Sequence, residues 1–390
     1  MTKRFKILTF NNISVAGLER LAHERYEVAS EIQHPDAILL RSASLHDLQV
    51  PESLKAIGRA GAGVNNIPVP RMSESGIAVF NAPGANANAV KELVLAGLFL
   101  AARNITHAWA YARGLDGDAE AMERAMEQGK KRFVGFELPG RTLGVIGLGA
   151  IGVEVANTAI SLGMRVIGYD PGMTVSRAWQ LSSEVGQANS VGEVLRGADM
   201  VTLHVPFAPE TMSLIDAERI ALMREGVSLL NFSRGGIVDE EAVASALERG
   251  AMHAYVCDFP SPRLRGLDNV IALPHIGAST KEAEDNCAVM VAEQLKDFLE
   301  NGNVRHSVNF PDVSMPRNGG YRVAVVNRNV PNMLGQISTT LAAHDLNILD
   351  MLNKSRGDLA YTLLDAEQPV HDHVLAELEA IEGVLAVRAV

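Results

Sequence analysis

Short apolar runs alternate with helical patterns along the first part of the chain. The apolar runs are four or five residues long, as in buried strands, and a helical pattern over residues 15–22 separates the first two of them. This alternation is typical of a parallel sheet covered by helices on both faces. The predicted strands are Lys6–Phe10, Ala37–Leu40, Ala56–Arg59 and Ile77–Phe80.

A second series of strands and helices starts at Arg141, after one long helical segment predicted over residues 88–113. Six strands with helices between them make a complete dinucleotide-binding sheet. A helix predicted over residues 281–300 leaves this series and ends at the helix-stop sequence Asn301-Gly302-Asn303. The six predicted strands cover residues 143–146, 166–169, 200–204, 228–232, 254–258 and 270–273.

The last part of the chain has a different pattern. Residues 309–320 are rich in Pro, Asn, Gly and Ser and predict a linker. The segment that follows reads β-α-β-β-α-β, which is too short for catalytic machinery and fits a small regulatory module. Its predicted elements cover residues 322–326, 335–344, 347–353, 360–364, 371–381 and 384–390.

Composition narrows the class of protein. A chain of 390 residues has room for two or three domains. Its net charge of −11 argues against a general nucleic-acid or anionic-membrane partner, although local arginines can still hold an anionic substrate. Cys257 and Cys287 have neither a disulfide-framework nor a metal-ligand spacing, and no metal site is expected. The longest apolar run, residues 93–102, is roughly half a membrane span. We therefore expect a soluble, cytoplasmic protein.

The most specific motif is Gly147-Leu148-Gly149-Ala150-Ile151-Gly152, which follows a predicted strand and opens a predicted helix. Such glycines permit a tight turn and close approach of a diphosphate to the helix N-terminus. Asp170 ends the next strand, where a carboxylate accepts hydrogen bonds from a ribose and repels a 2′-phosphate, so NAD is favoured over NADP. The alternative is a structural turn with an unrelated surface aspartate.

Two further residues predict chemistry at strand ends. Arg234 and His275 each follow a strand of the second series, where open α/β sheets bind ligands. A guanidinium grips a carboxylate with two prongs. A histidine has the pKa needed to take a hydroxyl proton. Each residue taken alone also has a non-catalytic interpretation. Arg234 could form a surface ion pair, and His275 could be a structural histidine. With the glycine motif, they indicate hydride transfer to or from a 2-hydroxy acid.

These motifs resemble the D-isomer-specific 2-hydroxyacid dehydrogenases over almost the whole chain. Further matching segments are Leu203–Pro206, Pro209–Thr211, Asn231–Asp239 and Leu273–Thr280. The front segments Leu40–Ala43, Gly61–Asn66 and Phe80–Pro83 resemble the branch that oxidises 3-phospho-D-glycerate to 3-phosphooxypyruvate, the first step of phosphorylated serine biosynthesis. The alternatives are another 2-hydroxy acid, such as glycerate or 2-hydroxyglutarate, and a dinucleotide-sensing binding protein.

The resemblance also implies an architecture. A Rossmann-type doubly wound sheet (residues 98–284) would be inserted in a flavodoxin-like α/β substrate domain (1–97 and 285–315). The tail (319–390) resembles a ferredoxin-like ACT domain. The site would lie in the cleft between the first two domains. The family also implies a homodimer or a homotetramer.

Residue roles follow from the resemblance on the cofactor side. The amides of Ala150 and Ile151 would meet the NAD diphosphate, and Asp170 the adenosine ribose. Ser233 would also contact the cofactor, and Asp258 would face the nicotinamide amide. His204 and Pro206 would line the adenine side.

On the substrate side, Arg234 would bind the carboxylate and 2-oxygen, and His275 would be the acid and base. Backbone amides of Ala62, Gly63 and Val64 would meet the same carboxylate. Arg41 and Ser42 would hold the 3-phosphate. We add Lys91 from its position after the Asn81–Asn88 loop, with a solvated helix lysine as the alternative.

The chain departs from the family at the histidine partner. Relatives carry a glutamate a few residues after the aspartate that matches Asp258, whereas residues 259–265 contain no acid and only Asp268 precedes His275. Three alternatives remain for the partner of His275. Asp258 is the partner, Asp268 folds back to reach the imidazole, or His275 acts without a close carboxylate. The third predicts an acidic activity limb shifted to lower pH. Ala208 replaces a common threonine, which weakens one contact near the nicotinamide.

The tail departs from its relatives as well. Asn329 and Asn347 match positions that bind serine at a two-fold interface in some relatives. Asn327 stands where the serine-inhibited form has histidine. Asn332 replaces a glycine, and asparagine tolerates left-handed backbone, so the turn is expected to survive. Serine inhibition and a purely structural or dimerising module both remain open.

Overall fold

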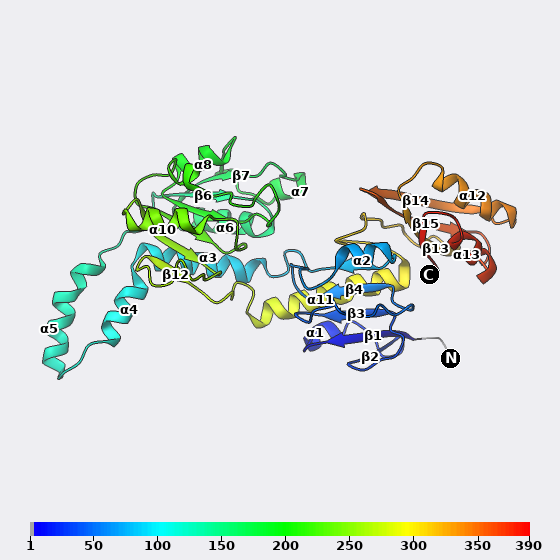
Figure 1. Cartoon of the computed structure of the whole chain (residues 1–390), viewed down its shortest axis with the longest axis horizontal. Coiled ribbons are helices and arrows are strands. Elements are labelled where there is room, and N and C mark those ends of the chain that lie inside the picture. Colours follow the sequence, from blue (N-terminus) through cyan, green and yellow to red (C-terminus); the bar gives the residue numbers. More distant parts are fainter. Residues whose placement is uncertain (1–3) are drawn as a thin grey trace. The chain divides into compact units, whose positions relative to one another are not determined.

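The computed structural model describes residues 4–390, which form two compact units. The first unit consists of the residues up to Asn86 together with those from Lys281 onward, so it includes the C-terminal module. The second unit is Ala87–Thr280. Figure 1 shows their elements in sequence colours. The α/β class with parallel sheets is confirmed.

The first sheet has five parallel strands in the order β2-β1-β3-β4-β5, the order of flavodoxin-like sheets. All four residues of β3 are buried, because helices cover both faces. The prediction of four strands missed β2, an edge strand whose exposed glutamate interrupts any apolar run. The strands are β1 (Phe5–Phe10), β2 (Tyr26–Ala29), β3 (Ala37–Leu40), β4 (Ala56–Arg59) and β5 (Ala78–Phe80).

Three helices accompany this sheet. Helix α11 packs the buried side chains of Val291, Leu295 and Phe298 into the core on one face. Helix α1 packs against α11 and is shorter than the predicted 15–22. The bounds are α1 (Val15–Leu18), α2 (Val69–Glu74) and α11 (Lys281–Asn301).

The second sheet has seven parallel strands in the order β12-β11-β10-β9-β6-β7-β8. The prediction of six strands missed β8, because its two residues, a glycine and a glutamine, make no apolar run. Strands β7 and β8 are added on one side of β6, and strands β9 to β12 on its other side. The point between β6 and β9 is therefore the switch point where such sheets bind ligands. The strands are β6 (Thr142–Ile146), β7 (Arg165–Tyr169), β8 (Gly186–Gln187), β9 (Met200–Leu203), β10 (Val227–Asn231), β11 (Met252–Cys257) and β12 (Val270–Ala272).

The predicted continuous helix over residues 88–113 is wrong, because the segment forms two helices, α3 (Ala87–Ala102) and α4 (Ile105–Arg113), bent by 69°. Asn104 sits at the break with φ of 50°, a left-handed conformation that asparagine tolerates. Among the described residues no single helix is long and apolar enough to cross a membrane, and this bent pair meets the criteria by length and composition only.

Helix α4 and the unpredicted α5 (Ala119–Gly129) form an arm that extends from the second unit (Figure 1). A 3₁₀ turn (Lys130–Phe133) ends the arm. The remaining helices of this unit have the bounds α6 (Ala150–Ser161), α7 (Val175–Ala178), α8 (Val191–Gly197), α9 (Ala217–Ile220) and α10 (Glu240–Glu248). Helices α6, α8 and α10 pack against the sheet.

The C-terminal module is a four-stranded antiparallel sheet in the order β14-β15-β13-β16. Its β-α-β-β-α-β pattern matches the predicted pattern and is a ferredoxin-like topology. One face packs on the two helices of the module, and the other face joins the core around Phe298 and Phe310. The elements are β13 (Tyr321–Arg328), α12 (Met333–Ala343), β14 (Ile348–Arg356), β15 (Leu359–Ala366), α13 (Asp372–Glu379) and β16 (Val384–Ala389).

Candidate active site

Most of the predicted site residues of the second unit lie at one edge of its sheet. Because all seven strands are parallel, their carboxyl ends share this edge, which we call the carboxyl edge. The predicted residues that directly follow β6, β7, β9, β10, β11 and β12 are, in chain order, Gly147 to Gly152, Asp170, His204 with Pro206, Ser233 with Arg234, Asp258 and His275.

The glycine motif forms the turn that its spacing predicts. Gly147 has φ of 92°, and a Cβ there would lie 2.5 Å from the carbonyl oxygen of His204. A Cβ on Gly152 would collide with the Gly147 carbonyl, whereas one on Gly149 would meet nothing within 4 Å. Helix α6 then begins at Ala150 without a side-chain cap. The open space and the uncapped first-turn amides fit the diphosphate of a dinucleotide.

Asp170 is held beside this turn. Its Oδ2 accepts a 2.8 Å hydrogen bond from the Leu148 N–H, and its Oδ1 accepts a 2.7 Å bond from the Gly172 N–H. Each carboxylate oxygen keeps a further lone pair for a hydroxyl donor. The geometry therefore fits the predicted ribose contact.

His204 follows β9, and its imidazole is uncharged at neutral pH. Its Nε2 lies 3.0 Å from the Thr202 hydroxyl, and burial lowers the pKa of His204 to about 3. The side chain keeps part of its surface accessible, beside the exposed Pro206. An uncharged ring suits a flat, uncharged base such as adenine.

The turn that carries Arg234 is built by the buried Asn231. Its Nδ2 donates to the Arg234 carbonyl at 2.9 Å, and its Oδ1 accepts from the Ser233 N–H at 3.1 Å. The Ser233 hydroxyl donates to the Leu203 carbonyl at 2.6 Å, which ties the turn to β9. The Arg234 side chain is exposed and donates one bond to the Ser233 carbonyl, which leaves most of its five N–H groups for a ligand.

Asp258 fixes the backbone next to His275 and does not contact its ring. The carboxylate is 1% exposed, and its two oxygens accept hydrogen bonds from the N–H groups of Ile276 (2.8 Å) and Gly277 (2.7 Å). His275 itself has φ of 56°, and its exposed ring packs 5.0 Å from the Phe259 ring. Within residues 87–280, no carboxylate is hydrogen-bonded to this imidazole. Asp268 is exposed, and its carbonyl accepts a hydrogen bond from His107.

The predicted substrate residues of the first unit lie at the carboxyl ends of β3 and β4. Asn11 accepts hydrogen bonds from the N–H groups of Ser42 (3.0 Å) and Ala43 (2.7 Å) and so shapes the loop after β3. Arg41 makes an ion pair with Glu284 at 2.6 Å. A phosphate bound by Arg41 would have to displace that carboxylate.

The loop after β4 carries Ala62, Gly63 and Val64. The Asn81 side chain donates to the Ala62 carbonyl at 2.5 Å and holds this loop from β5. Sequence reasoning missed Arg59, which ends β4 and donates to the Arg41 carbonyl at 3.0 Å. Its position at a strand end, next to the glycine loop, was the available signal.

Lys91 belongs to the second unit, in the first turns of α3, where its ammonium donates to Asn88 Oδ1 at 2.5 Å. In the C-terminal module, Asn329 donates to the Gly357 carbonyl at 3.1 Å and Asn347 to Glu367 at 3.4 Å, both from exposed positions. Asn332 adopts φ of 63°, which confirms that asparagine keeps this turn left-handed.

Known proteins match this chain along most of its length. The family model of the D-isomer specific 2-hydroxyacid dehydrogenase, NAD binding domain, matches residues 105–277. D-3-phosphoglycerate dehydrogenase of Escherichia coli is 33% identical over 87% of this chain and 82% of its own length. Putative D-3-phosphoglycerate dehydrogenase of Schizosaccharomyces pombe is 34% identical over 97% of this chain and 85% of its own. The chain belongs to the D-isomer-specific 2-hydroxyacid dehydrogenase family.

Other family members are longer than this chain. D-3-phosphoglycerate dehydrogenase of Methanocaldococcus jannaschii is 37% identical over 86% of this chain, which spans 62% of that relative. For the enzymes of the same name from Synechocystis and Archaeoglobus fulgidus the chain spans 57% and 54%.

Solved structures of the family agree with the fold. The NAD+-bound 3-phosphoglycerate dehydrogenase of Entamoeba histolytica is 26% identical and superposes with a TM-score of 0.62, over 79% of this chain and 99% of its own. The family model describes an NAD binding domain, and the residues that it matches, 105–277, lie in the second unit.

Proposed function

We propose that this family member oxidises 3-phospho-D-glycerate to 3-phosphooxypyruvate with NAD, the first step of phosphorylated serine biosynthesis. The observation that carries the proposal is the carboxyl edge of the second sheet. Asn231 and Asp258 hold two exposed side chains, Arg234 and His275, on the same edge as the glycine turn. The names of several relatives support the substrate.

Each residue has a role in this proposal. NAD, when bound, supplies the hydride acceptor. Arg234 binds the substrate carboxylate and 2-oxygen with its fork of N–H donors. The imidazole of His275 takes the proton of the 2-hydroxyl in oxidation and returns it in reduction. Because no carboxylate holds its ring within the second unit, we assign its orientation to the backbone clamp of Asp258 and to the Phe259 contact.

The first unit would supply the selectivity for phosphate. Arg41 and Ser42 would hold the 3-phosphate, and the amides of Ala62, Gly63 and Val64 the carboxylate. Lys91 of the second unit would add a cation. The Arg41–Glu284 ion pair would keep the guanidinium ordered until substrate replaces the carboxylate. We assign residues 1–97 and 285–315 to substrate, 98–284 to NAD, and 319–390 to an ACT-type regulatory module.

An NADH assay tests the function. The purified chain is given NAD with 3-phosphoglycerate, D-glycerate or D-2-hydroxyglutarate. We expect turnover with phosphoglycerate, no turnover in His275→Gln, and a KM for phosphoglycerate raised at least tenfold in Arg41→Ala, with the KM for D-glycerate unchanged. The matched variant Glu284→Gln frees Arg41 and should lower the phosphoglycerate KM by up to about fivefold, since exposed pairs are worth at most ~1 kcal/mol.

The assay also separates the other candidate functions. Faster turnover of an unphosphorylated acid, with no effect of Arg41→Ala, would assign a different 2-hydroxy acid. NAD binding without turnover of any acid would indicate a sensing protein.

Partners and regulation are proposed as well. We propose a homodimer, or a homotetramer, in which the α4–α5 arm meets a second copy. L-serine is proposed to act at Asn329 and Asn347 of the C-terminal module, and inhibition by added L-serine that is lost in Asn347→Ala tests this. The buried free thiols of Cys257 and Cys287 support a reducing compartment such as the cytoplasm.

A further inference from the structure

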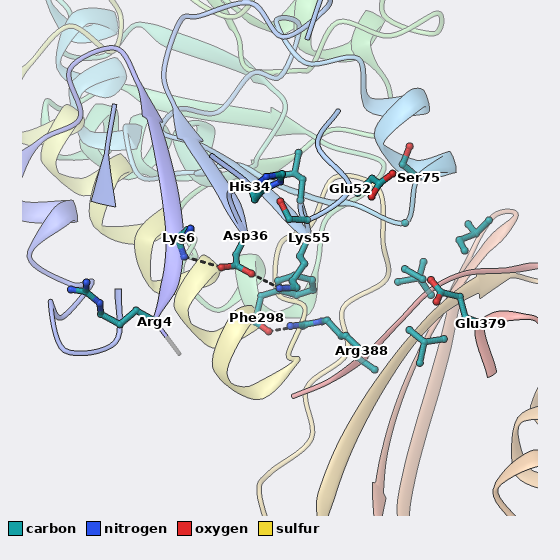
Figure 2. A pocket seen from close by; sticks show the side chains of 18 residues that line it. Arg4, Lys6, His34, Asp36, Glu52, Lys55, Ser75, Phe298, Glu379 and Arg388 are labelled. Atoms are coloured by element: carbon teal, nitrogen blue, oxygen red, sulfur yellow. Dashed lines mark hydrogen bonds and ion pairs between the residues drawn. The ribbon is translucent and has the colours of Figure 1, made fainter. Parts of the chain in front are cut away.

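A cavity of about 540 Å³ lies inside the first unit, away from its predicted substrate residues. It opens where the amino ends of β1, β3, β4 and β5 face the C-terminal module (Figure 2). Because these strands are parallel, their amino ends are at the opposite edge of the sheet from Arg41 and Ala62. The cavity is therefore separate from the candidate active site.

Its floor is apolar and comes from the module and from α11. The apolar lining residues are Phe298 of α11, Ala324 and Val326 of β13, and Leu385 of β16. Volumes of this size, with an apolar surface and a few converging polar groups, are typical of small-molecule sites.

Positive charge gathers around one buried carboxylate in this cavity. Asp36, 7% exposed, pairs with the ammonium of Lys55 and accepts a 2.8 Å hydrogen bond from the backbone N–H of Lys6. Arg388 is held close by, because it donates to the Phe298 carbonyl at 2.6 Å and its guanidinium lies 4.0 Å from the centre of the Phe298 ring. Figure 2 shows Lys6, Lys55 and Arg388 around Asp36 and Phe298.

Two carboxylates line the cavity away from this group of cations. Glu52 precedes β4 and Glu379 ends α13, and Figure 2 shows Glu52 beside Ser75 and Glu379 on the C-terminal module, to the right of Arg388. Neither carboxylate has a hydrogen bond or an ion pair to another residue among residues 4–390. The lining holds four cationic side chains, Arg4 included, and three carboxylates, so it carries one net positive charge in a chain whose total is −11.

We propose that this cavity binds a free amino acid that carries a second acidic group. Its carboxylates would meet Lys6, Lys55 and Arg388, and its ammonium would meet Glu52 and Glu379. Such a ligand carries both positive and negative groups, as the lining does. Its net charge of minus one balances the net positive charge of the lining. An occupant would bridge the C-terminal module to the first sheet and to α11.

Calorimetric titration of the full chain with L-glutamate tests the proposal, with glutarate as the matched probe that lacks the ammonium. We expect L-glutamate to bind at least tenfold more tightly than glutarate. Lys6→Ala should weaken both ligands at least fivefold, and it keeps the hydrogen bond to Asp36, which comes from the backbone of Lys6. Glu379→Gln should weaken L-glutamate and spare or strengthen glutarate. The control Lys131→Ala, in the other unit, should change neither.

Three results would overturn the proposal. Equal binding of glutarate and L-glutamate would make this a plain anion site. Binding that is insensitive to Lys6→Ala and Glu379→Gln would place the ligand elsewhere, and no detectable binding of L-glutamate would leave the cavity without this role. None of these results depends on dehydrogenase activity, so the proposed function is tested separately.

Discussion

The carboxylate of Asp258 holds the backbone of the loop that carries His275. A left-handed, non-glycine residue costs on the order of 1–2 kcal/mol. Hydrogen bonds to a charged group contribute about 1.5–3 kcal/mol each, so the two bonds from Ile276 and Gly277 outweigh that cost. The buried charge thus holds the histidine through the backbone, in a chain whose sequence lacks the usual glutamate.

Replacing Asp258 by Asn tests this clamp. An amide side chain has one acceptor oxygen, so one of the two backbone N–H groups would face an NH₂ donor. We expect kcat to fall about 10- to 100-fold, the equivalent of one lost charge-assisted bond of about 1.5–3 kcal/mol. Steady-state kinetics measures this, with Asp268→Asn as the control because Asp268 is exposed. An unchanged kcat in Asp258→Asn would show that the loop holds its shape by other contacts.

His204 gives a prediction about pH. Burial lowers the pKa of His204 to about 3 in the folded chain, below the ordinary 6.5. The unfolded chain therefore binds the extra proton, and the contribution of His204 to stability is lost as pH falls from 6.5 toward 3. We expect the His204 ring signal in histidine-labelled NMR spectra to stay at its neutral position at pH 5. Comparison with His204→Gln assigns the signal, and a shift between pH 7 and pH 5 would contradict the burial argument.

At the scale of elements, the break between α3 and α4 creates an arm with little of its own core. Helix α4 has no buried residue, and Gly129 is the one buried residue of α5. Trp109 is 59% exposed and Ile105 42% exposed on α4. Helices this short are marginal in water without a packed apolar face, so a second copy of the chain is the partner we expect for this surface.

Replacing Trp109 by Glu tests the role of the arm. A charge in an apolar interface is costly to desolvate, so we expect the variant to elute with a lower mass than the proposed dimer or tetramer of the unmodified chain. Light scattering after size-exclusion chromatography measures the mass. Lys131→Glu, just beyond α5, is the control for added negative charge. A variant with the mass of the unmodified chain would exclude Trp109 from the interface.

At the scale of the whole molecule, one buried arginine of the C-terminal module, Arg322 of β13, joins the module to the rest of the first unit. Arg322 is 1% exposed and donates two hydrogen bonds to Asp365, at 2.7 and 2.8 Å. Its guanidinium also donates to the carbonyls of Asn301, Met315 and Pro316. The predicted linker is therefore part of the packed structure, and Phe310, Val313 and Met315 are buried in it.

Arg322→Met should separate the module from the unit. Removing one partner leaves Asp365 as a buried unpaired charge, which costs about 3–5 kcal/mol. We expect a lower temperature for the first thermal transition and faster proteolysis between residues 315 and 320. The double variant Arg322→Met with Asp365→Leu removes the unpaired charge and should recover part of the stability. Equal stability of Arg322→Met and the unmodified chain would contradict this account.

Local order along the chain determined most of the fold class. The alternation of apolar runs and helical patterns predicted both parallel sheets, and the glycine spacing from Gly147 to Gly152 predicted the turn after β6, because both depend on neighbouring residues. The same reasoning predicted the positions of Arg234 and His275 at strand ends. The short edge strands β2 and β8 were missed, since they have too few apolar residues to show a period.

Contacts between distant residues were decided only by the tertiary structure. No local pattern shows that Asp258 holds the backbone after His275, that Glu284 pairs with Arg41, or that Arg322 reaches Asp365. The left-handed Asn104 likewise divides a segment that is periodic as one helix. Periodicity tells which side of an element is buried, whereas the partner of a charged or polar group depends on where the chain returns in space.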